Sequence, residues 1–168
     1  MAIKDSGERR NFESGAVRDI TEGKGRCDLL PLRTIGFIEN DSVLKDIDKY
    51  VRTGNKFCIV KVIKTFSEKY FGDLHTAMLE VSKHYEEGCN KYGERNWEKG
   101  IPLHCYIDSG TRHYLKHLRG DTDEPHDRAF LWNMLGAIWT HDNHPEMVDL
   151  PCASRPQVKK EDKTNEDN

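Results

Sequence analysis

Three successive helical patterns constrain the fold of this chain most strongly. In the first, over residues 74–92, apolar side chains recur every three or four positions, and Gly93 follows where such a helix would end. The second covers residues 103–119 and ends at Gly120, and the third, over residues 129–139, is apolar nearly all round. A helix of the last kind must be buried on most sides, so the patterns predict that it lies at the centre of the molecule.

The preceding segments are compatible with further helices. Residues 42–52 show helical spacing, with Ser42 as the expected N-cap and Gly54 just past the end. Residues 57–66, FCIVKVIKTF, would suit either a short strand or a helix. We favour the helix, because an isolated strand would find no partner elsewhere. The expected fold class is therefore all-α.

Length and composition favour one small domain. The 168 residues suit a single unit, which we place at 15–150, with a flexible segment at 1–14 and a disordered charged tail at 151–168. Only 36% of the residues are hydrophobic and 33% are charged. Because a core of this composition is modest, we expect a bundle completed by association with further copies, as a homodimer or homotetramer.

Charge and cysteine usage exclude several classes of protein. The formal net charge is −3 and basic residues are spread along the chain, which argues against binding a nucleic-acid polymer or an anionic membrane. The five cysteines form no CxxC pair, so a disulfide framework is not indicated. We see neither a signal peptide nor a membrane span, and expect a cytoplasmic protein.

Carboxylates and imidazoles gather in the second half of the chain, on two neighbouring helices and the start of the next. Such groups can enclose a hard divalent cation, Mg²⁺ or Mn²⁺, which would bridge phosphate oxygens of a substrate and activate water. Arg112, Lys91 and Lys116 can hold the remaining phosphate charge. The candidate ligands and catalytic groups are Glu80, Glu87, His113, Asp121, Asp123, Glu124, His126 and Asp127.

The same residues allow structural interpretations. Glu80, His84, Glu87 and Lys91 form one polar stripe that can simply be a solvated helix face. Trp97 can be a hydrophobic plug or a platform for a planar ligand. Under this alternative the chain is a helical interaction module without catalysis. Asn133 is polar within the apolar third helix, so it needs hydrogen-bonding partners, and we expect them among the site groups.

A second catalytic alternative depends on the pair His126-Asp127. Preceded by His104 or His113 and followed by Asp142, it gives the order of ligands found in HD-type metal phosphohydrolases. Such an enzyme would release tripolyphosphate from a deoxynucleoside triphosphate. The helices here look too short and too few for that larger fold.

Lys24 and Arg26 lie in a glycine-rich segment near the N-terminus. Glycines let backbone amides approach a phosphate, but the order of residues is not that of a P-loop, and Pro31 follows where a helix would begin. Taken alone, the segment is better described as an entry loop.

Taken together, three segments resemble one family. The segments are GAVRD with GKGRCDLLPL, KYGERNWEKGIP, and RHYLKHLRGDTDEPHDRAFLWN. They are similar to phage and bacterial dATP/dGTP diphosphohydrolases, which are related to MazG-like all-α nucleotide pyrophosphohydrolases. The chain departs from that pattern at residues 41–70, which look like an insertion, and in lacking an intact ExxE motif.

The resemblance implies an oligomeric all-α bundle that splits purine deoxynucleoside triphosphates, dATP or dGTP, into the monophosphate and pyrophosphate in a bacterial or phage-infected cytoplasm. It also implies roles for particular residues. Glu80, His113, Asp123 and His126 would surround the metal, and Lys24, Arg26, Lys91, Tyr92, Asn96 and Trp97 would bind the nucleotide. From the residues themselves we add Arg112, Lys116 and Asn133 to the expected substrate-binding residues. We expect Glu80, Glu87, Asp123 and Glu124 to supply metal oxygens, His126 and Asp127 to be further ligands, and Glu80, Glu87 and His113 to be catalytic.

Overall fold

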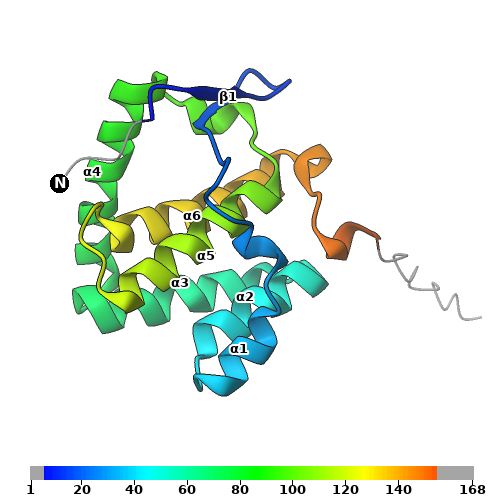
Figure 1. Ribbon diagram of the computed structural model, residues 1–168, viewed down its shortest axis with the longest axis vertical. Helices are drawn as coiled ribbons and strands as arrows, with labels where there is room; N and C mark the ends of the chain where they lie inside the picture. Colours follow the sequence, from blue (N-terminus) through cyan, green and yellow to red (C-terminus); the bar gives the residue numbers. More distant parts are fainter. Residues whose placement is uncertain (1–5, 155–168) are drawn as a thin grey trace, which may run out of the picture.

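The computed structural model describes residues 6–154 and shows an all-α fold with a small β-hairpin. Two helices, α5 (Leu103–Arg119) and α6 (His126–Asn143), run side by side through the middle of the molecule (Figure 1). Helices α2 (Ser42–Thr53) and α3 (Lys56–Phe71) pack beneath them, α1 (Leu32–Ile38) lies at the bottom, and α4 (Leu74–Tyr92) rises along one side. The prediction of an all-α class is confirmed.

Capping residues explain where these helices begin and end. Asp73 caps α4 by accepting a hydrogen bond from the amide of Thr76 at 2.9 Å. Gly93 follows α4 with φ of 91° and Gly120 follows α5 with φ of 84°, a backbone conformation that favours glycine. The predicted ends of both helices are therefore confirmed.

The structure corrects one expectation about α2 and decides between helix and strand for residues 57–66. The side chain of Asp41, rather than Ser42, caps α2 by accepting from the amides of Val43 and Leu44 at 2.7 and 3.1 Å. An aspartate one position earlier satisfies two amides at once, which leaves no capping role for the serine. Residues 57–66 form part of α3, so the choice of helix over strand is confirmed.

Phe66 occupies the centre of the core below α5 and α6. Its ring is fully buried and lies 4.7 Å from that of Phe130 and 5.9 Å from that of Tyr114, centroid to centroid. The third helical pattern is accordingly central, with Phe130, Leu131 and Met134 completely buried.

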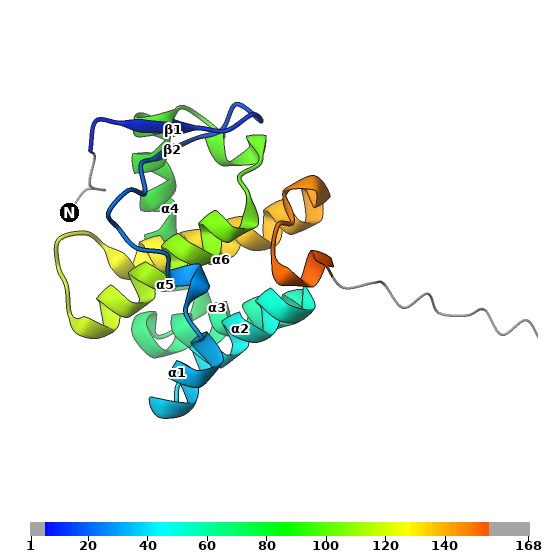
Figure 2. The ribbon, with the colours of Figure 1, turned by 45° about the vertical axis from the view of Figure 1, so that its right-hand side comes forward.

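The N-terminal part adds structure that the sequence does not predict. Strands β1 (Arg9–Asn11) and β2 (Val17–Asp19) pair antiparallel, and the hairpin crosses above the C-terminal end of α4 (Figure 2). Residues 9–11, expected to be flexible, are thus a strand. Residues 151–154, expected to be disordered, form a 3₁₀ turn in which Cys152 packs against the core. The rest of the predicted tail lies outside the described residues.

Candidate functional site

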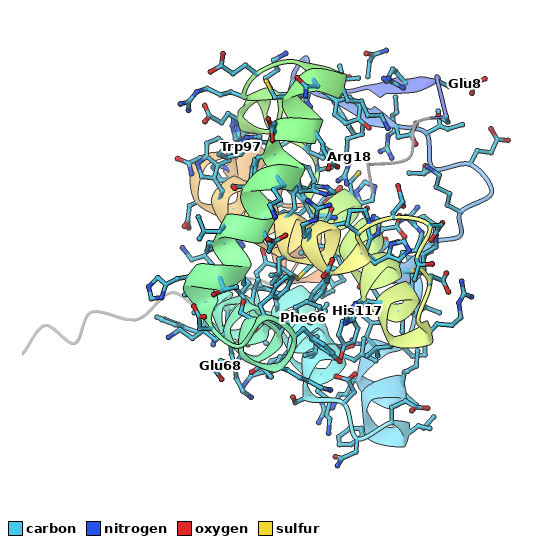
Figure 3. All side chains as sticks on the ribbon, turned by 90° about the vertical axis from the view of Figure 1, so that its left-hand side faces the viewer. Glu8, Arg18, Phe66, Glu68, Trp97 and His117 are labelled. Carbon is cyan, nitrogen blue, oxygen red and sulfur yellow. The ribbon has the colours of Figure 1, made fainter. Side chains whose placement is uncertain are left out.

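A cavity of about 410 Å³ lies beneath the β-hairpin. It is walled by the hairpin and the segment after it, by α4 and by α5 and α6. Each helix contributes one stripe of side chains at helical spacing, which is why residues distant in sequence meet here. Figure 3 shows Arg18 of β2 beside α4, above the core around Phe66.

The lining of this cavity is strongly basic. Six lysine and arginine side chains border it, against three carboxylates. Two of those carboxylates already pair with cations of the lining: Asp19 with Lys24 at 3.0 Å, and Asp108 with Arg112. The resulting positive field favours an anionic ligand. The six cations are Arg10, Arg18, Lys24, Lys91, Arg112 and Lys116.

The segment that carries Lys24 is fastened to α5. The guanidinium of Arg112 donates to the carbonyl oxygens of Lys24 and Gly25 at 3.1 and 3.2 Å, and Asp108 accepts from the amide of Cys27 at 2.7 Å. The glycine-rich segment is therefore a fixed part of the cavity wall, although its sequence alone suggests only a loop.

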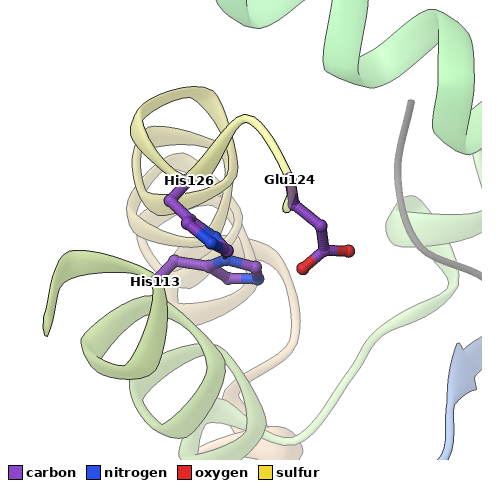
Figure 4. Close-up of side chains that lie close together, drawn as sticks. All are labelled: His113, Glu124 and His126. Carbon is purple, nitrogen blue, oxygen red and sulfur yellow. Dashed lines mark hydrogen bonds between the residues drawn. The ribbon is translucent and has the colours of Figure 1, made fainter. Parts of the chain in front are cut away.

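The imidazoles of His113 and His126 and the carboxylate of Glu124 lie close together where α6 begins (Figure 4), and His113 and Glu124 line the cavity. Asp121 and Asp123 complete this cluster. The Nδ1 atoms of His113 and His126 are 2.9 Å apart, and Nε2 of His126 lies 2.7 Å from a carboxylate oxygen of Asp123. Burial, reinforced by the neighbouring His126, holds the pKa of His113 well below its usual value. His113 is therefore neutral at physiological pH.

The hydrogen bonds fix the tautomer of this pair. When His126 is neutral and donates its Nε2 proton to Asp123, its Nδ1 must accept, so Nδ1 of His113 is the donor. The lone pair of His113 then lies on Nε2. That atom is the one that can accept a proton or bind a metal ion.

The cluster fits a divalent cation. His113, Glu124 and His126 have ligand atoms within 4.8 Å of one another, and so do Asp121, Asp123 and His126. Carboxylate oxygens suit both Mg²⁺ and Mn²⁺, whereas imidazole nitrogens are better ligands for Mn²⁺. Of the two ions expected from the sequence, the mixed donors favour Mn²⁺.

Most of the predicted substrate-binding residues do meet in the cavity. Asn96 has a structural task there, since its amide accepts from the backbone N–H of Val17 at 2.9 Å and donates to the carbonyl of Val17 at 2.8 Å. Asn133, buried as predicted, accepts from Arg18 at 3.0 Å. Those that line the cavity are Lys24, Lys91, Tyr92, Asn96, Arg112, Lys116 and Asn133.

Two predicted nucleotide contacts lie elsewhere. Trp97 packs its ring against Trp139 and Tyr85, with centroids 4.8 and 5.6 Å apart, as the packing alternative expects. Arg26 pairs with Asp28 and borders a different groove. Neither side chain lines the cavity.

Five predicted acidic residues, Glu80, Glu87, Asp121, Glu124 and Asp127, border a second, more open groove, which Glu124 shares with the cavity and which His126 also lines. Glu80 pairs with Lys83, and Glu87 lies 3.6 Å from Arg128. Asp127 accepts from the amide of Arg128. Glu80, Glu87 and Asp127 thus line the groove beside His126 but are not among the close ligand sets, whereas Asp121, Asp123 and Glu124 are.

The ligand set of the HD-type alternative is not assembled. Asp142 pairs with Lys56 near the far end of α6, about 24 Å along the helix from His126. His104 pairs with Asp149, away from the cluster. The structure therefore argues against this alternative.

Among the residues of the cavity wall that sequence reasoning did not assign to the site are Arg10, Arg18, His84 and Trp132. The first two are cross-strand partners in the hairpin, a pairing that three-residue strands do not reveal in the sequence. His84 belongs to the polar stripe of Glu80, Glu87 and Lys91 but was given no role in binding, and Trp132, next to Asn133, follows no stripe of predicted residues.

Comparison with known proteins adds a family. Residues 69–150 match the family described as dATP/dGTP diphosphohydrolase, N-terminal. This match over 82 of the 168 residues supports the resemblance seen in the sequence. The matched segment contains α4, α5 and α6 and the whole imidazole and carboxylate cluster, but not the hairpin. A dATP/dGTP diphosphohydrolase family is one of hydrolases acting on nucleoside triphosphates.

No curated protein and no solved structure matches the chain. Among the helices of residues 6–154, none is long and apolar enough to cross a membrane.

Proposed function

We propose that the chain hydrolyses purine deoxynucleoside triphosphates, dATP or dGTP, to the monophosphate and pyrophosphate in the cytoplasm. One observation carries this proposal: a basic cavity opens directly onto a cluster of imidazoles and carboxylates suited to a divalent cation. The family supports the substrate class.

The cations that can bind the phosphates of the substrate come from several elements of the fold. Arg112 and Lys116 lie one helical turn apart on α5, next to Lys24 of the fastened segment, and together these can hold a chain of phosphates. Lys116 also pairs with Asp123 at 3.2 Å, which keeps its ammonium beside the cluster. The phosphates would therefore lie near His113.

A divalent cation, Mn²⁺ or Mg²⁺, would bind at Nε2 of His113 and at the carboxylate of Glu124, with Asp121 and Asp123 nearby, and would supply charge neutralisation and an activated water. His126, both of whose ring nitrogens make hydrogen bonds, would orient His113. Residues of the chain would hold the ligands of this ion and the attacking water in position. Asp123 and His126 fix the ring of His113, and Glu124 lies between the cavity and the acidic groove, where it can orient water. Glu80 and Glu87 would contribute their carboxylates to catalysis from the groove that they line.

We also propose that the protein assembles as a homodimer or homotetramer. Leu29, Phe37 and Ile38 expose 70%, 61% and 76% of their surface, which a second copy could cover. Light scattering after gel filtration measures the mass directly.

The proposal is tested by incubating the full chain with each deoxynucleoside triphosphate and Mg²⁺ or Mn²⁺, and resolving the products by ion exchange. Monophosphate and pyrophosphate from dATP or dGTP are expected, and EDTA should abolish their formation. Glu124→Gln should lower kcat at least tenfold, because a carboxylate worth several kcal/mol of charge stabilisation is lost. Glu68→Gln, on the exposed face of α3, is the matched control.

Two outcomes would contradict the proposal. Nucleoside with tripolyphosphate would support the triphosphohydrolase reaction. No turnover of any substrate, together with no effect of Mn²⁺ on the melting temperature, would favour an interaction module without catalysis.

A further inference from the structure

Arg18 occupies an unusual position in the cavity wall. Its guanidinium carbon lies 5.3 Å from the ring centroid of Tyr106 and 5.4 Å from that of Trp132. Two aromatic rings therefore lie next to its guanidinium.

The guanidinium is held firmly in this place. Its Nη2 donates to the side-chain oxygen of Asn133 at 3.0 Å, and the nitrogen of that amide donates to the carbonyl of Ala129 at 2.8 Å. The second bond fixes the orientation of Asn133, so Asn133 presents its oxygen to Arg18. A side chain fixed by two rings and an amide is preorganised for a ligand.

Two polar atoms beside Trp132 nevertheless have no partner within residues 6–154. They are Nη1 of Arg18 and Nδ1 of His84, both buried. His84 is 9% exposed, lines the cavity, and has its ring centroid 5.7 Å from that of Trp132. A buried polar group without a partner costs about 1–3 kcal/mol. Two such atoms from different elements beside one indole indicate a ligand that supplies their partners.

The chemistry of the two groups defines that ligand. Arg18 can only donate hydrogen bonds. Burial, helped by Arg128, Arg18 and Lys91, lowers the pKa of His84 to about 4, so its imidazole is neutral. The partner of Arg18 must therefore be an acceptor, beside an aromatic surface suited to a planar ring.

We propose that Arg18 contacts the purine base of the substrate and selects guanine over adenine, with Trp132 as the neighbouring aromatic surface. Guanine offers two adjacent acceptors, O6 and N7, and arginine is the side chain that pairs with them. Adenine has an amino group in place of O6, so its donors would face those of Arg18. This inference rests on the proposed function, and it assigns specificity to a hairpin residue outside the matched segment.

The test compares dGTP, dITP and dATP as substrates, because dITP keeps O6 and N7 but lacks the 2-amino group. Wild type should prefer dGTP and dITP over dATP. Arg18→Met should lower kcat/KM for dGTP and dITP about tenfold to a hundredfold, the range expected for loss of one such contact, and change dATP far less. Arg33→Met is the control, since Arg33 is exposed and lies over Phe37 on α1.

Arg18→Lys distinguishes the base from a phosphate as the partner. Lysine keeps the charge but loses the planar pair of donors, so the preference for guanine should disappear. If Arg18 instead binds phosphate, lysine should restore activity on all three substrates alike. Equal losses on dGTP and dATP in Arg18→Met, or a wild-type preference for dATP, would overturn the inference. Circular dichroism checks that each variant folds, and Arg18→Lys alone still compares dGTP with dATP if Arg18→Met does not fold.

Binding of the monophosphates separates this inference from the proposed function. Calorimetry with dGMP and dAMP requires no turnover, and tighter binding of dGMP that Arg18→Met removes would support the base contact even if nothing is hydrolysed. Turnover of triphosphates without any difference between dGMP and dAMP would leave the hydrolase intact and overturn the role of Arg18.

Discussion

At the scale of single residues, Asn96 joins the loop after α4 to strand β2 through both ends of its side-chain amide. The residue is only 7% exposed, and its two hydrogen bonds with Val17 complete the edge of the hairpin. Its contribution to binding a substrate would then be indirect, through the position of the hairpin that carries Arg10 and Arg18.

Asn96→Ala should therefore loosen the hairpin. Removing both bonds leaves two backbone groups of Val17 without partners, so we expect a loss of about 1–3 kcal/mol in unfolding free energy and faster proteolysis near residues 9–19. Urea unfolding and limited proteolysis measure these effects. Asn143→Ala is the control, because Asn143 makes one exposed hydrogen bond on α6. Unchanged proteolysis in Asn96→Ala would show that the hairpin is held by other contacts.

His104 gives a prediction about pH. Its hydrogen bond with Asp149, then that with Cys105, raises its pKa to about 10. Because the unfolded value is near 6.5, the folded state binds the proton more tightly, and this contribution to stability is complete below about pH 6.5 and disappears as the pH rises to about 10. The difference in unfolding free energy between wild type and His104→Gln should therefore shrink over that range. A constant difference would contradict the pairing.

At the scale of elements, the close approach of α5 and α6 depends on two glycines. A Cβ atom at Gly136 would lie 2.4 Å from a ring carbon of Tyr106, and one at Gly110 would lie 2.5 Å from the terminal methyl of Met134. Tyr106 is also a neighbour of Arg18, so this contact supports the wall of the cavity. Packing between the two helices and the shape of the site are thus coupled.

Gly136→Ala should destabilise the protein by about 1–3 kcal/mol, since a buried ring must move to admit the methyl group. Gly88→Ala provides a matched contrast on α4. No atom lies within 4 Å of the added Cβ there, so the gain in helix propensity should raise stability by about 0.5–1 kcal/mol. Thermal and urea unfolding measure both. Equal effects of the two substitutions would show that the approach of α5 and α6 is more adaptable than the structure indicates.

Across the whole molecule, local signals in the sequence were sufficient to predict the helices. Gly54, Gly93 and Gly120 mark the ends of α2, α4 and α5, because a left-handed or extended positive-φ residue must follow each helix. The hairpin could not be predicted in this way. Its strands have three residues each, and its position depends on Asn96, which is distant in the sequence.

The site was predictable to the extent that it follows helical periodicity. Lys91, Arg112, Lys116 and Asn133 line the cavity because each lies on the inner stripe of its helix. Glu80 and Glu87, assigned to the same face of α4 as Lys91, turn toward a separate groove. Spacing alone does not show that residues on one face of α4 line two different pockets. The position of Arg18 beside Trp132 likewise depends on packing between elements, which the sequence does not show.

The central claim is that the chain splits a deoxynucleoside triphosphate between its α and β phosphates. Hydrolysis of dGTP in water enriched in ¹⁸O tests it most directly, with mass spectrometry of all products. Our account predicts one ¹⁸O atom per turnover, carried by the monophosphate or the pyrophosphate, and its place shows which phosphorus the water attacks. Labelled inorganic phosphate, or tripolyphosphate with nucleoside, would contradict the account.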